Sequence, residues 1–414
     1  MNTQEGIITP YSVIREHIAS KCELLKGHPD TVDGHLNHEQ AVTNDYLGRV
    51  LYELLQNAVD RAEKHIWINV DRSRKSLIVA NDGESFGYVK REGEPRSDFA
   101  ALCAIDTSNK AMGKSIGNKG VGFKSVWSIG NSVQIRTRCA LTGAWGFRLR
   151  WPFNADHLSN WNDQTLATDI EQSLKAAKLE QKHRGCAPSF YFPEYIELEN
   201  LNEDALDILE GLVDELVSRP LIFVSDIRMG VELTLSVQST HLEQSLSKPL
   251  FTESSRWLRL DVDVAAKETE LASALKKLGV ELGRSPRLTL AFPIDVAAQA
   301  ASAGLVHSYL PTNQATGSFI ELHGDFYLEE SRKAVDFRDI HYNALLLDLA
   351  ADALLKALLT NDQGLAHYSR SLDFLKVNSL IGRRLLTLLK GDGERLSCIV
   401  AHILQGPYEK KGVW

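Results

Sequence analysis

The chain has 414 residues, of which 43% are hydrophobic and 24% are charged. This composition excludes wholesale disorder and fibrous structure, and the length predicts two or three domains. A net charge of −8 argues against a protein whose whole surface is built to grip nucleic acid or acidic lipid. The five cysteines are scattered and include no C-x-x-C pair, which disfavours a disulfide framework and a zinc ribbon.

Neither a secretory signal nor a membrane span is expected. The N-terminal sequence MNTQEGIITPYS lacks an apolar core. The most apolar stretch, residues 344–359, contains Asp348, Asp352 and Lys356, which are spaced four residues apart and fall on one helical stripe. We therefore expect an amphipathic surface helix there, and a soluble, cytoplasmic protein without a membrane partner.

The first third of the chain is predicted to place two helices before a hairpin. The expected elements are a helix over residues 9–28, a polar loop over 28–44, a helix over 45–64 capped by Asn44, and strands HIWINV and SLIVAN joined by DRSRKS. The glycine- and lysine-rich residues 82–125 are expected to be a long mobile segment. The loop histidines His28, His35 and His38 match no standard metal spacing.

The rest of the chain is predicted to be mixed α and β structure. We expect strands over residues 131–139, 146–151 and 189–196, a helix over 203–218, strand character over 221–235, a second α/β unit over 250–360 and a helical end. The predicted domains are 1–235, 236–360 and 361–414.

The helix YLGRVLYELLQNAVDRA has two faces. Its apolar residues recur at helical spacing and are expected to pack inward; they are Leu47, Val50, Leu51, Leu54, Ala58 and Ala62. Glu53, Asn57 and Asp60 share another face. An amide oxygen one turn from a carboxylate can hold hydrated Mg²⁺ while the carboxylate orients water. A solvated polar stripe is the alternative interpretation.

Two glycine-containing segments follow this helix. VANDGESF, residues 79–86, ends a strand and offers Asn81 or Asp82 as acceptors for a purine amino group, with Phe86 as a packing surface. In DTSNKAMGKSIGNKGVGFKSVW, residues 106–127, the glycines allow backbone N–H groups to approach an anion. This second segment fits neither the Walker pattern nor the dinucleotide pattern, so it is a different phosphate loop.

The order and spacing of these segments resemble those of the GHKL ATPases, most closely the sacsin type. ELLQNAVDRA is similar to the N-box of that superfamily, VANDGESF to the first glycine box and IGNKGVGFKSVW to the second. Two positions depart from the family pattern: Asn81 stands where an adenine-reading aspartate is usual, and Val59 and Arg61 stand where sacsin-like sequences tend to have Asp and Ala.

The resemblance implies specific roles. Glu53 would be the general base that activates water, Asn57 would bind Mg²⁺, and residues 110–125 would form a lid over the phosphates of ATP. The residues expected to bind the nucleotide are Asn57, Asp60, Asn81, Asp82, Gly83, Phe86, Lys110, Gly117, Asn118, Lys119, Gly120, Val121, Gly122, Phe123, Lys124 and Ser125.

The resemblance continues more loosely into residues 306–337, which are similar to a segment of a transducer-like domain in sacsin-like proteins. By analogy, Arg332 would reach the terminal phosphate, with Lys333 as a substitute. The alternative is a surface arginine paired with Glu329, Glu330 or Asp336.

The sequence QIRTRCALTGAWGFRLRW predicts a hairpin turning about Gly143. In that register Arg136 would face Arg150 and Arg138 would face Arg148, which is destabilising unless acidic side chains or an anionic ligand such as nucleic acid offset the charge. We expect acidic side chains, given the acidic chain.

We therefore expect an α/β protein, an α+β two-layer sandwich of the GHKL type followed by a transducer-like α/β domain and a helical C-terminal segment. The expected activity is slow Mg²⁺-dependent ATP hydrolysis that drives lid closure and conformational work on a protein partner or client, as in a chaperone-type or defence-system ATPase, with a nucleotide-dependent homodimer as a further expectation. The alternatives are a nucleotide-gated interaction module without turnover and a DNA-processing ATPase of the mismatch-repair type.

Overall fold

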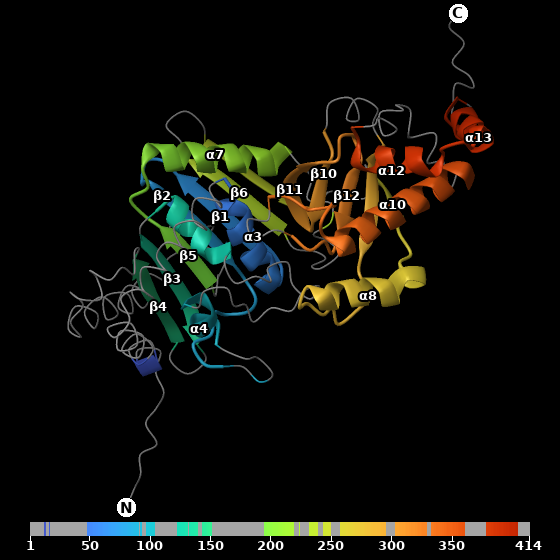
Figure 1. The fold of residues 1–414 in the computed structure, drawn as a ribbon. Helices are drawn as coiled ribbons and strands as arrows, with labels where there is room; N and C mark the ends of the chain where they lie inside the picture. The colour runs from blue at the N-terminus through green and yellow to red at the C-terminus, as the bar shows by residue number, and fades with distance from the viewer. Residues whose placement is uncertain are drawn as a thin grey trace, which may run out of the picture. The chain divides into compact units, whose positions relative to one another are not determined.

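The computed structural model describes residues 48–90, 97–103, 122–130, 132–139, 143–150, 194–218, 232–238, 243–249, 257–294, 303–328, 333–360 and 378–404, together with Ser12, Val13, Glu16, Glu92 and Phe223. The chain divides into two compact units (Figure 1). Unit 1 contains the described residues up to 249 except Phe223, and unit 2 contains Phe223 and the described residues from 257 onward. Both units combine helices with a mixed sheet, so the protein is of the α/β class.

Unit 1 is built on a seven-stranded sheet with the order β4-β3-β5-β2-β1-β6-β7. Its strands are β1 (His65–Asp71), β2 (Ser76–Asn81), β3 (Ser132–Cys139), β4 (Gly143–Arg150), β5 (Glu194–Leu198), β6 (Glu232–Gln238) and β7 (Glu243–Pro249). Only the β1–β6 pair is parallel among these seven strands. Strands are described at the three predicted places, 131–139, 146–151 and 189–196, with β4 beginning already at Gly143 and β5 continuing to Leu198.

The predicted β1–β2 hairpin is confirmed, with Ile66 opposite Asn81 and Asp71 opposite Ser76. The Asp71 carboxylate closes the turn by accepting bonds from the Ser73 hydroxyl at 2.6 Å and the Arg74 N–H at 3.0 Å. Because side chains alternate along a strand, residues such as Ile66 and Asn81 share one face of the sheet.

The two faces of this sheet differ in character. One face is almost wholly apolar and buried; its members in the two central strands are Ile66, Ile68, Val70, Leu77 and Val79. On the other face Trp67, Ile78 and Ala80 form a separate apolar cluster beside polar residues such as Asn69. Asn81 is the polar residue at the end of the apolar face.

Four described helices accompany the sheet of unit 1: α3 (Val50–Arg61), α4 (Asp98–Cys103), the short 3-10 helix η1 (Gly122–Ser128) and α7 (Glu203–Ser218). Helix α3 contacts β2 and η1, and α7 contacts α3, β1 and β6 (Figure 1). The bounds of α7 are those predicted. Helix α4 lies inside the segment that the sequence predicts to be mobile, so that prediction is wrong for these residues.

Helix α3 is shorter than predicted. It begins at Val50 with Arg49 as its N-cap residue, not at Asp45 with Asn44 as the cap. The reason is Gly48, whose φ of +85° is left-handed and interrupts any helix that approaches from the N-terminal side. At the other end, Ala62 is extended with ψ of 140° and ends the helix before Lys64.

Of the strand character predicted over residues 221–235, the structure describes Phe223, which lies in a turn and not in a strand, and residues 232–235, which belong to β6; the other residues of this range lie outside the described part of the chain. Of the predicted helix over residues 9–28, the structure describes Ser12, Val13 and Glu16, which are helical.

Unit 2 contains a five-stranded sheet with the order β11-β10-β12-β9-β8 and helices packed on it (Figure 1). The elements are β8 (Trp257–Asp261), η4 (Ala265–Lys267), α8 (Glu268–Lys277), β9 (Leu288–Pro293), β10 (Leu305–Ser308), β11 (Leu310–Ala315), β12 (Glu321–Gly324), α10 (His341–Thr360), α12 (Leu380–Leu388) and α13 (Gly393–Leu404). Leu290, Val306 and Leu322 face α10 in one continuous core. The described residues from 257 to 360 contain both strands and helices, and α12 and α13 follow them and share the same core.

Helix α10 carries the predicted polar stripe, with Asp348 half-buried and Asp352 and Lys356 exposed. Eleven of its twenty residues are buried, including Leu346 and Leu354, which are in the core. No helix among the described residues is both long enough and apolar enough to cross a membrane.

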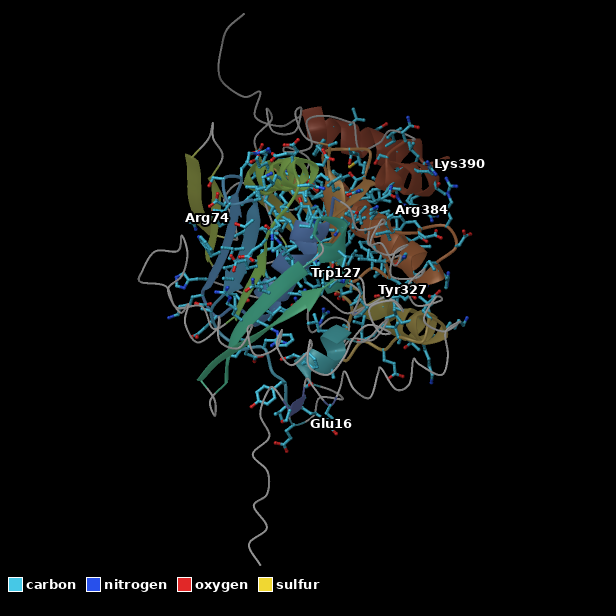
Figure 2. The ribbon with its side chains drawn as sticks, turned by 90° about the vertical axis from the view of Figure 1, so that its left-hand side faces the viewer. Glu16, Arg74, Trp127, Tyr327, Arg384 and Lys390 are labelled. Carbon is cyan, nitrogen blue, oxygen red and sulfur yellow. The ribbon has the colours of Figure 1, made fainter. Side chains whose placement is uncertain are left out.

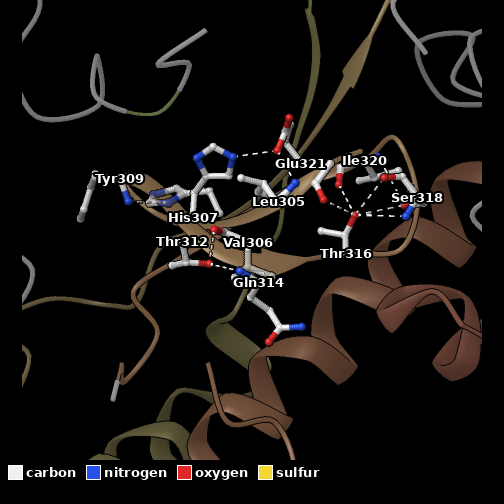
Figure 3. A network of polar contacts seen from close by, with 12 residues as sticks. Leu305, Val306, His307, Tyr309, Thr312, Gln314, Thr316, Ser318, Ile320 and Glu321 are labelled. Carbon is white, nitrogen blue, oxygen red and sulfur yellow. Dashed lines mark hydrogen bonds and ion pairs between the residues drawn. The ribbon is translucent and has the colours of Figure 1, made fainter. Parts of the chain in front are cut away.

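The opposite face of the unit 2 sheet holds a buried polar network, part of which Figure 3 shows. His307 Nε2 lies 2.7 Å from a carboxylate oxygen of Glu321, which also accepts the Leu305 N–H at 2.6 Å. The Thr316 hydroxyl bonds the Ile320 carbonyl at 2.8 Å. The two contacts of Glu321 join β10 to β12, and the Thr316 bond closes the connection that leads into β12.

Candidate functional site

Helix α3 is buried on almost every side, and its apolar residues lie where the sequence predicts. Val50, Leu51 and Leu54 are fully buried, and Ala58 and Ala62 are 3% and 1% exposed. Of the three polar residues on the remaining face, Glu53 is only 2% exposed, while Asn57 and Asp60 are half-buried. The polar face is therefore not the solvated stripe of the alternative interpretation.

Glu53 forms an ion pair that the sequence analysis missed. Its carboxylate oxygen Oε1 lies 3.9 Å from Arg49 Nε, and the Arg49 side chain is 3% exposed. The Arg49 guanidinium carbon also lies 5.6 Å from the centre of the Tyr52 ring. The i, i+4 spacing of Arg49 and Glu53 was the sequence signal that could have revealed this pair.

Asn81 ends β2 on the apolar face of the sheet and is 2% exposed. Its side-chain amide nitrogen donates a hydrogen bond to the Asp82 carbonyl at 2.9 Å. Because the nitrogen is used in this way, the Asn81 side chain presents its oxygen as the remaining acceptor.

Asp82 has a structural task of its own. Its Oδ1 accepts three backbone N–H groups, those of Glu63 at 2.9 Å, Lys64 at 2.8 Å and His65 at 2.9 Å, and its Oδ2 lies 2.9 Å from His65 Nδ1. Partial burial works against the charged carboxylate, but these hydrogen bonds outweigh it and lower the pKa of Asp82. The carboxylate therefore holds the backbone of the residues that connect α3 to β1.

Gly83 brings the turn after β2 into direct contact with the end of α3. Its φ is +94°, and a Cβ at this position would lie 2.3 Å from the Arg61 carbonyl oxygen and 2.8 Å from the Glu63 nitrogen. The Glu84 N–H then donates to the same Arg61 carbonyl at 3.1 Å. Only glycine fits this turn, so the glycine of VANDGESF is explained by the close approach of two backbones.

Arg61 connects the last turn of α3 to the start of α4. Its guanidinium forms a short ion pair with Asp98 at the start of α4. The other oxygen of Asp98 accepts the Gly87 N–H at 2.7 Å. Phe86, between these contacts, is 8% exposed, and its carbonyl accepts a bond from the Thr137 hydroxyl at 3.3 Å.

The end of the second glycine-containing segment, residues 106–127, also contacts α3. The helix η1 packs against α3, with Phe123 half-buried and Ser125 fully buried; Trp127 of η1 is labelled in Figure 2. For Gly122 and Lys124 the structure describes only the backbone. The predicted phosphate-loop residues that lie outside the described residues are Lys110, Gly117, Asn118, Lys119, Gly120 and Val121.

Several other predicted residues also lie outside the described part of the chain: Arg332, Glu329, Glu330 and the histidines His28, His35 and His38. Lys333 is half-buried, and its carbonyl accepts the Asn313 N–H at 2.8 Å. Within the described ranges, no three His, Cys, Asp or Glu side chains are grouped so that they could hold a metal ion.

The register of the arginine-rich hairpin differs from the prediction. Arg136 lies opposite Gly146, Arg138 opposite Ala144 and Gln134 opposite Arg148, so the pairing of the two strands is centred two residues before Gly143. No two arginines face each other directly in this pair of strands. Arg136 lies 3.2 Å from the buried Glu197 carboxylate, the acidic partner that we expected.

A scan against protein-family models gave no match to this chain, and a search of curated proteins likewise found no similar sequence.

Proposed function

We propose that this protein is a Mg²⁺-dependent ATP-binding protein of the GHKL type that hydrolyses ATP slowly. The observation that supports this proposal is that two separate segments, the end of β2 and η1, both contact α3. The end of β2 docks on the last turn of α3 through Gly83, and η1 packs on the same helix. Segments that are far apart in the sequence, and that resemble the boxes of an ATP site, are thereby in contact with one helix.

Mg²⁺ would be held by the Asn57 amide oxygen together with waters and the phosphates of the nucleotide. Asn57 and Asp60 are half-buried oxygen-bearing side chains, which suit a hard cation that keeps most of its waters. The ion would neutralise the phosphate charge. Glu53, one helical turn from Asn57, would take a proton from the attacking water.

Asn81 is our candidate for reading the base. The carboxylate of Asp82 is already engaged by three backbone N–H groups and His65, so it has little capacity left for a ligand. The Asn81 oxygen is an acceptor at the end of the apolar face, and an acceptor suits the exocyclic amino group of adenine. Residues 110–125 would supply the lid over the phosphates.

The proposed output is conformational work on a protein partner, as in a sacsin-like chaperone-type or defence-system ATPase, with a homodimer formed when ATP is bound. A nucleotide-gated module without turnover is the second candidate, and the buried carboxylate of Glu53 favours an enzyme over it. A DNA-processing ATPase has less support because Arg136 is paired with Glu197 within the sheet.

Steady-state phosphate release from Mg·ATP, measured alongside ATP binding, tests the proposal. Glu53→Ala is expected to lower turnover by about 10²–10⁴ while ATP binding persists, because a general base contributes about that factor. The exposed Glu63→Ala is the matched control and should leave turnover unchanged. Binding without turnover in the wild type would favour the gated module, and absence of ATP binding would refute the ATP site.

A further inference from the structure

Unit 2 has an open groove of about 410 Å³ at α8 and the first residue of α10. The two helices pack against each other (Figure 1). The polar residues that line the groove are Lys267, Thr269, Glu270, Ser273, Lys277 and His341. Small-molecule sites usually occupy about 300–1,000 Å³ and present a few polar groups to the ligand. The volume of the groove and its mixture of ammonium, carboxylate, imidazole and hydroxyl groups therefore suit a small polar ligand.

One wall of the groove is a stripe of three donors on α8. Thr269, Ser273 and Lys277 are spaced four residues apart and share one face of the helix. A long helical side chain extends toward the helix N-terminus, so the Lys277 ammonium can reach the turn that carries Ser273. Within the described part of the chain, Lys277 forms no ion pair or hydrogen bond. A hydroxyl and an ammonium are thus within reach of one anion.

The hydroxyls of Thr269 and Ser273 are not used by their own helix. Elsewhere in unit 2 the hydroxyls of Thr360, Thr387 and Ser397 each donate to the carbonyl four residues earlier, at 3.0, 3.0 and 2.8 Å. This is a common local bond of helical serine and threonine. Among the described residues, Thr269 and Ser273 make no such bond. Both hydroxyls therefore remain available to a ligand.

The other end of the groove contains charges that already balance. Lys267 Nζ donates to Glu270 Oε2 at 2.7 Å, and His341 Nε2 lies 3.8 Å from Glu270 Oε1. Asp352 of α10 is a further negative charge near Lys267. Because these carboxylates face Lys267, Lys277 is the lysine of the groove that is left for an anion. The Glu270 carboxylate and the exposed imidazole suit the hydroxyl groups of a ligand.

We propose that this groove binds a small hydroxylated phosphate ester, with its phosphate between Ser273 and Lys277 and its hydroxyl groups toward Glu270 and His341. A phosphate accepts hydrogen bonds from several donors at once, and lysine binds it as a point charge. All the lining residues belong to unit 2, so the inference does not depend on the proposed ATPase function.

Calorimetric titration of the full chain with glycerol 3-phosphate, in the absence of ATP, tests this inference. Saturable binding is expected, and Lys277→Gln should raise the Kd about tenfold, the scale of one lost charge-assisted hydrogen bond. Lys276→Gln is the matched control, because this exposed neighbour removes the same charge but does not line the groove. It should change the Kd by less than about twofold, since salt screens charges that are not in contact.

Further ligands and one variant identify the chemistry that is recognised. Inorganic phosphate and acetate should bind more weakly than glycerol 3-phosphate. Glu270→Gln should weaken the binding of glycerol 3-phosphate but not that of inorganic phosphate, because only the ester carries hydroxyl groups. Equal affinity for the two phosphates would overturn the assignment of an ester and leave inorganic phosphate as the ligand, and equal affinity for acetate would overturn the assignment of a phosphate.

The site itself would be overturned by three results: no saturable binding, binding that Lys277→Gln leaves unchanged, or equal losses in Lys276→Gln and Lys277→Gln. The last result would mean attraction to the general charge of α8. Serine 273 offers a second check, because Ser273→Ala removes one donor at an exposed position and should also raise the Kd. Failure of the chain to bind ATP would refute the proposed function and leave the outcome of this titration unaffected.

Discussion

At the scale of single residues, one carboxylate organises the connection between α3 and β1. Asp82 follows β2 in sequence, yet its Oδ1 accepts the N–H groups of Glu63, Lys64 and His65, about eighteen residues earlier in the chain. Hydrogen bonds to a charged acceptor are the stronger kind. The turn that carries Asn81 and Gly83 is therefore held to the end of α3 by Asp82.

Replacing Asp82 with asparagine should destabilise unit 1. The amide cannot accept these bonds as strongly, and hydrogen bonds to charged groups are worth about 1.5–3 kcal/mol each, so a loss of about 2–3 kcal/mol in the free energy of unfolding is expected. Urea denaturation at pH 7 measures it. Glu63→Gln, at an exposed carboxylate beside the same turn, should change stability by less than about 0.5 kcal/mol. Equal stability of the two variants would refute this role of Asp82.

The contribution of Asp82 should also depend on pH. Its pKa in the folded state is below the ordinary value, so the stabilisation is complete above the unfolded pKa and is lost as the pH falls through the lower folded pKa. The difference in unfolding free energy between the wild type and Asp82→Asn should therefore be constant near neutral pH and shrink below about pH 4. A difference that grows with acidification would contradict this assignment.

At the scale of elements, the joint between α3 and β2 depends on the absence of a side chain. Gly83 approaches the backbone of Arg61 and Glu63 so closely that no Cβ fits, and its φ of +94° is unfavourable for other residues. The glycine in this motif thus has a packing reason independent of any ligand. The close approach of Gly83 also fixes the position of Asn81, which lies two residues earlier in the chain.

Gly83→Ala should disrupt this joint. Backbone strain alone costs about 1–3 kcal/mol, and the overlap with the Arg61 carbonyl requires the end of α3 to shift as well. Thermal or urea unfolding measures the loss, and under the proposed function the Kd for ATP should rise too. Gly211→Ala in α7, where a Cβ meets nothing within 4 Å, should stabilise the protein by up to about 1 kcal/mol. Similar effects at both glycines would refute the close-approach argument.

At the scale of the whole molecule, Phe223 belongs to a different unit from the two elements that flank it in the chain. It follows α7 and precedes β6, both in unit 1, but it is fully buried in unit 2. Its ring stacks on His323 with centroids 4.7 Å apart and meets the edge of His307 at 4.9 Å. The aromatic ring thereby covers the polar face of the unit 2 sheet next to the His307–Glu321 pair.

Phe223→Ala should therefore destabilise unit 2. Truncation of a buried phenylalanine costs about 3–5 kcal/mol, and it would leave two imidazoles without their apolar neighbour. Hydrogen exchange should show lost protection in β10 and β12, with smaller changes in β1 and β2. Leu388→Ala, at a side chain that is 40% exposed, is the control. Lost protection confined to β1 and β2 would contradict the placement of Phe223.

The sequence by itself determined the elements whose patterns are local. The periodicity of α7, the alternation of β1 and β2 around DRSRKS and the polar stripe of α10 each follow from residues a few positions apart. The inward-facing residues of α3 were readable for the same reason. Its start was not, because Gly48 interrupts the pattern through its backbone conformation and not through polarity.

Only the tertiary structure decided which groups meet across long separations. Cross-strand register depends on where a turn closes, and a shift of the turn by two residues separated the arginines that the sequence placed face to face. The engagement of Asp82 by the end of α3, the pairing of Arg61 with Asp98 and the burial of Phe223 between two histidines have no local pattern. Hydrogen-bond satisfaction and close packing are properties of the folded chain as a whole, and they engage the Asp82 carboxylate with the backbone of residues 63–65 and the Asn81 amide nitrogen with the Asp82 carbonyl.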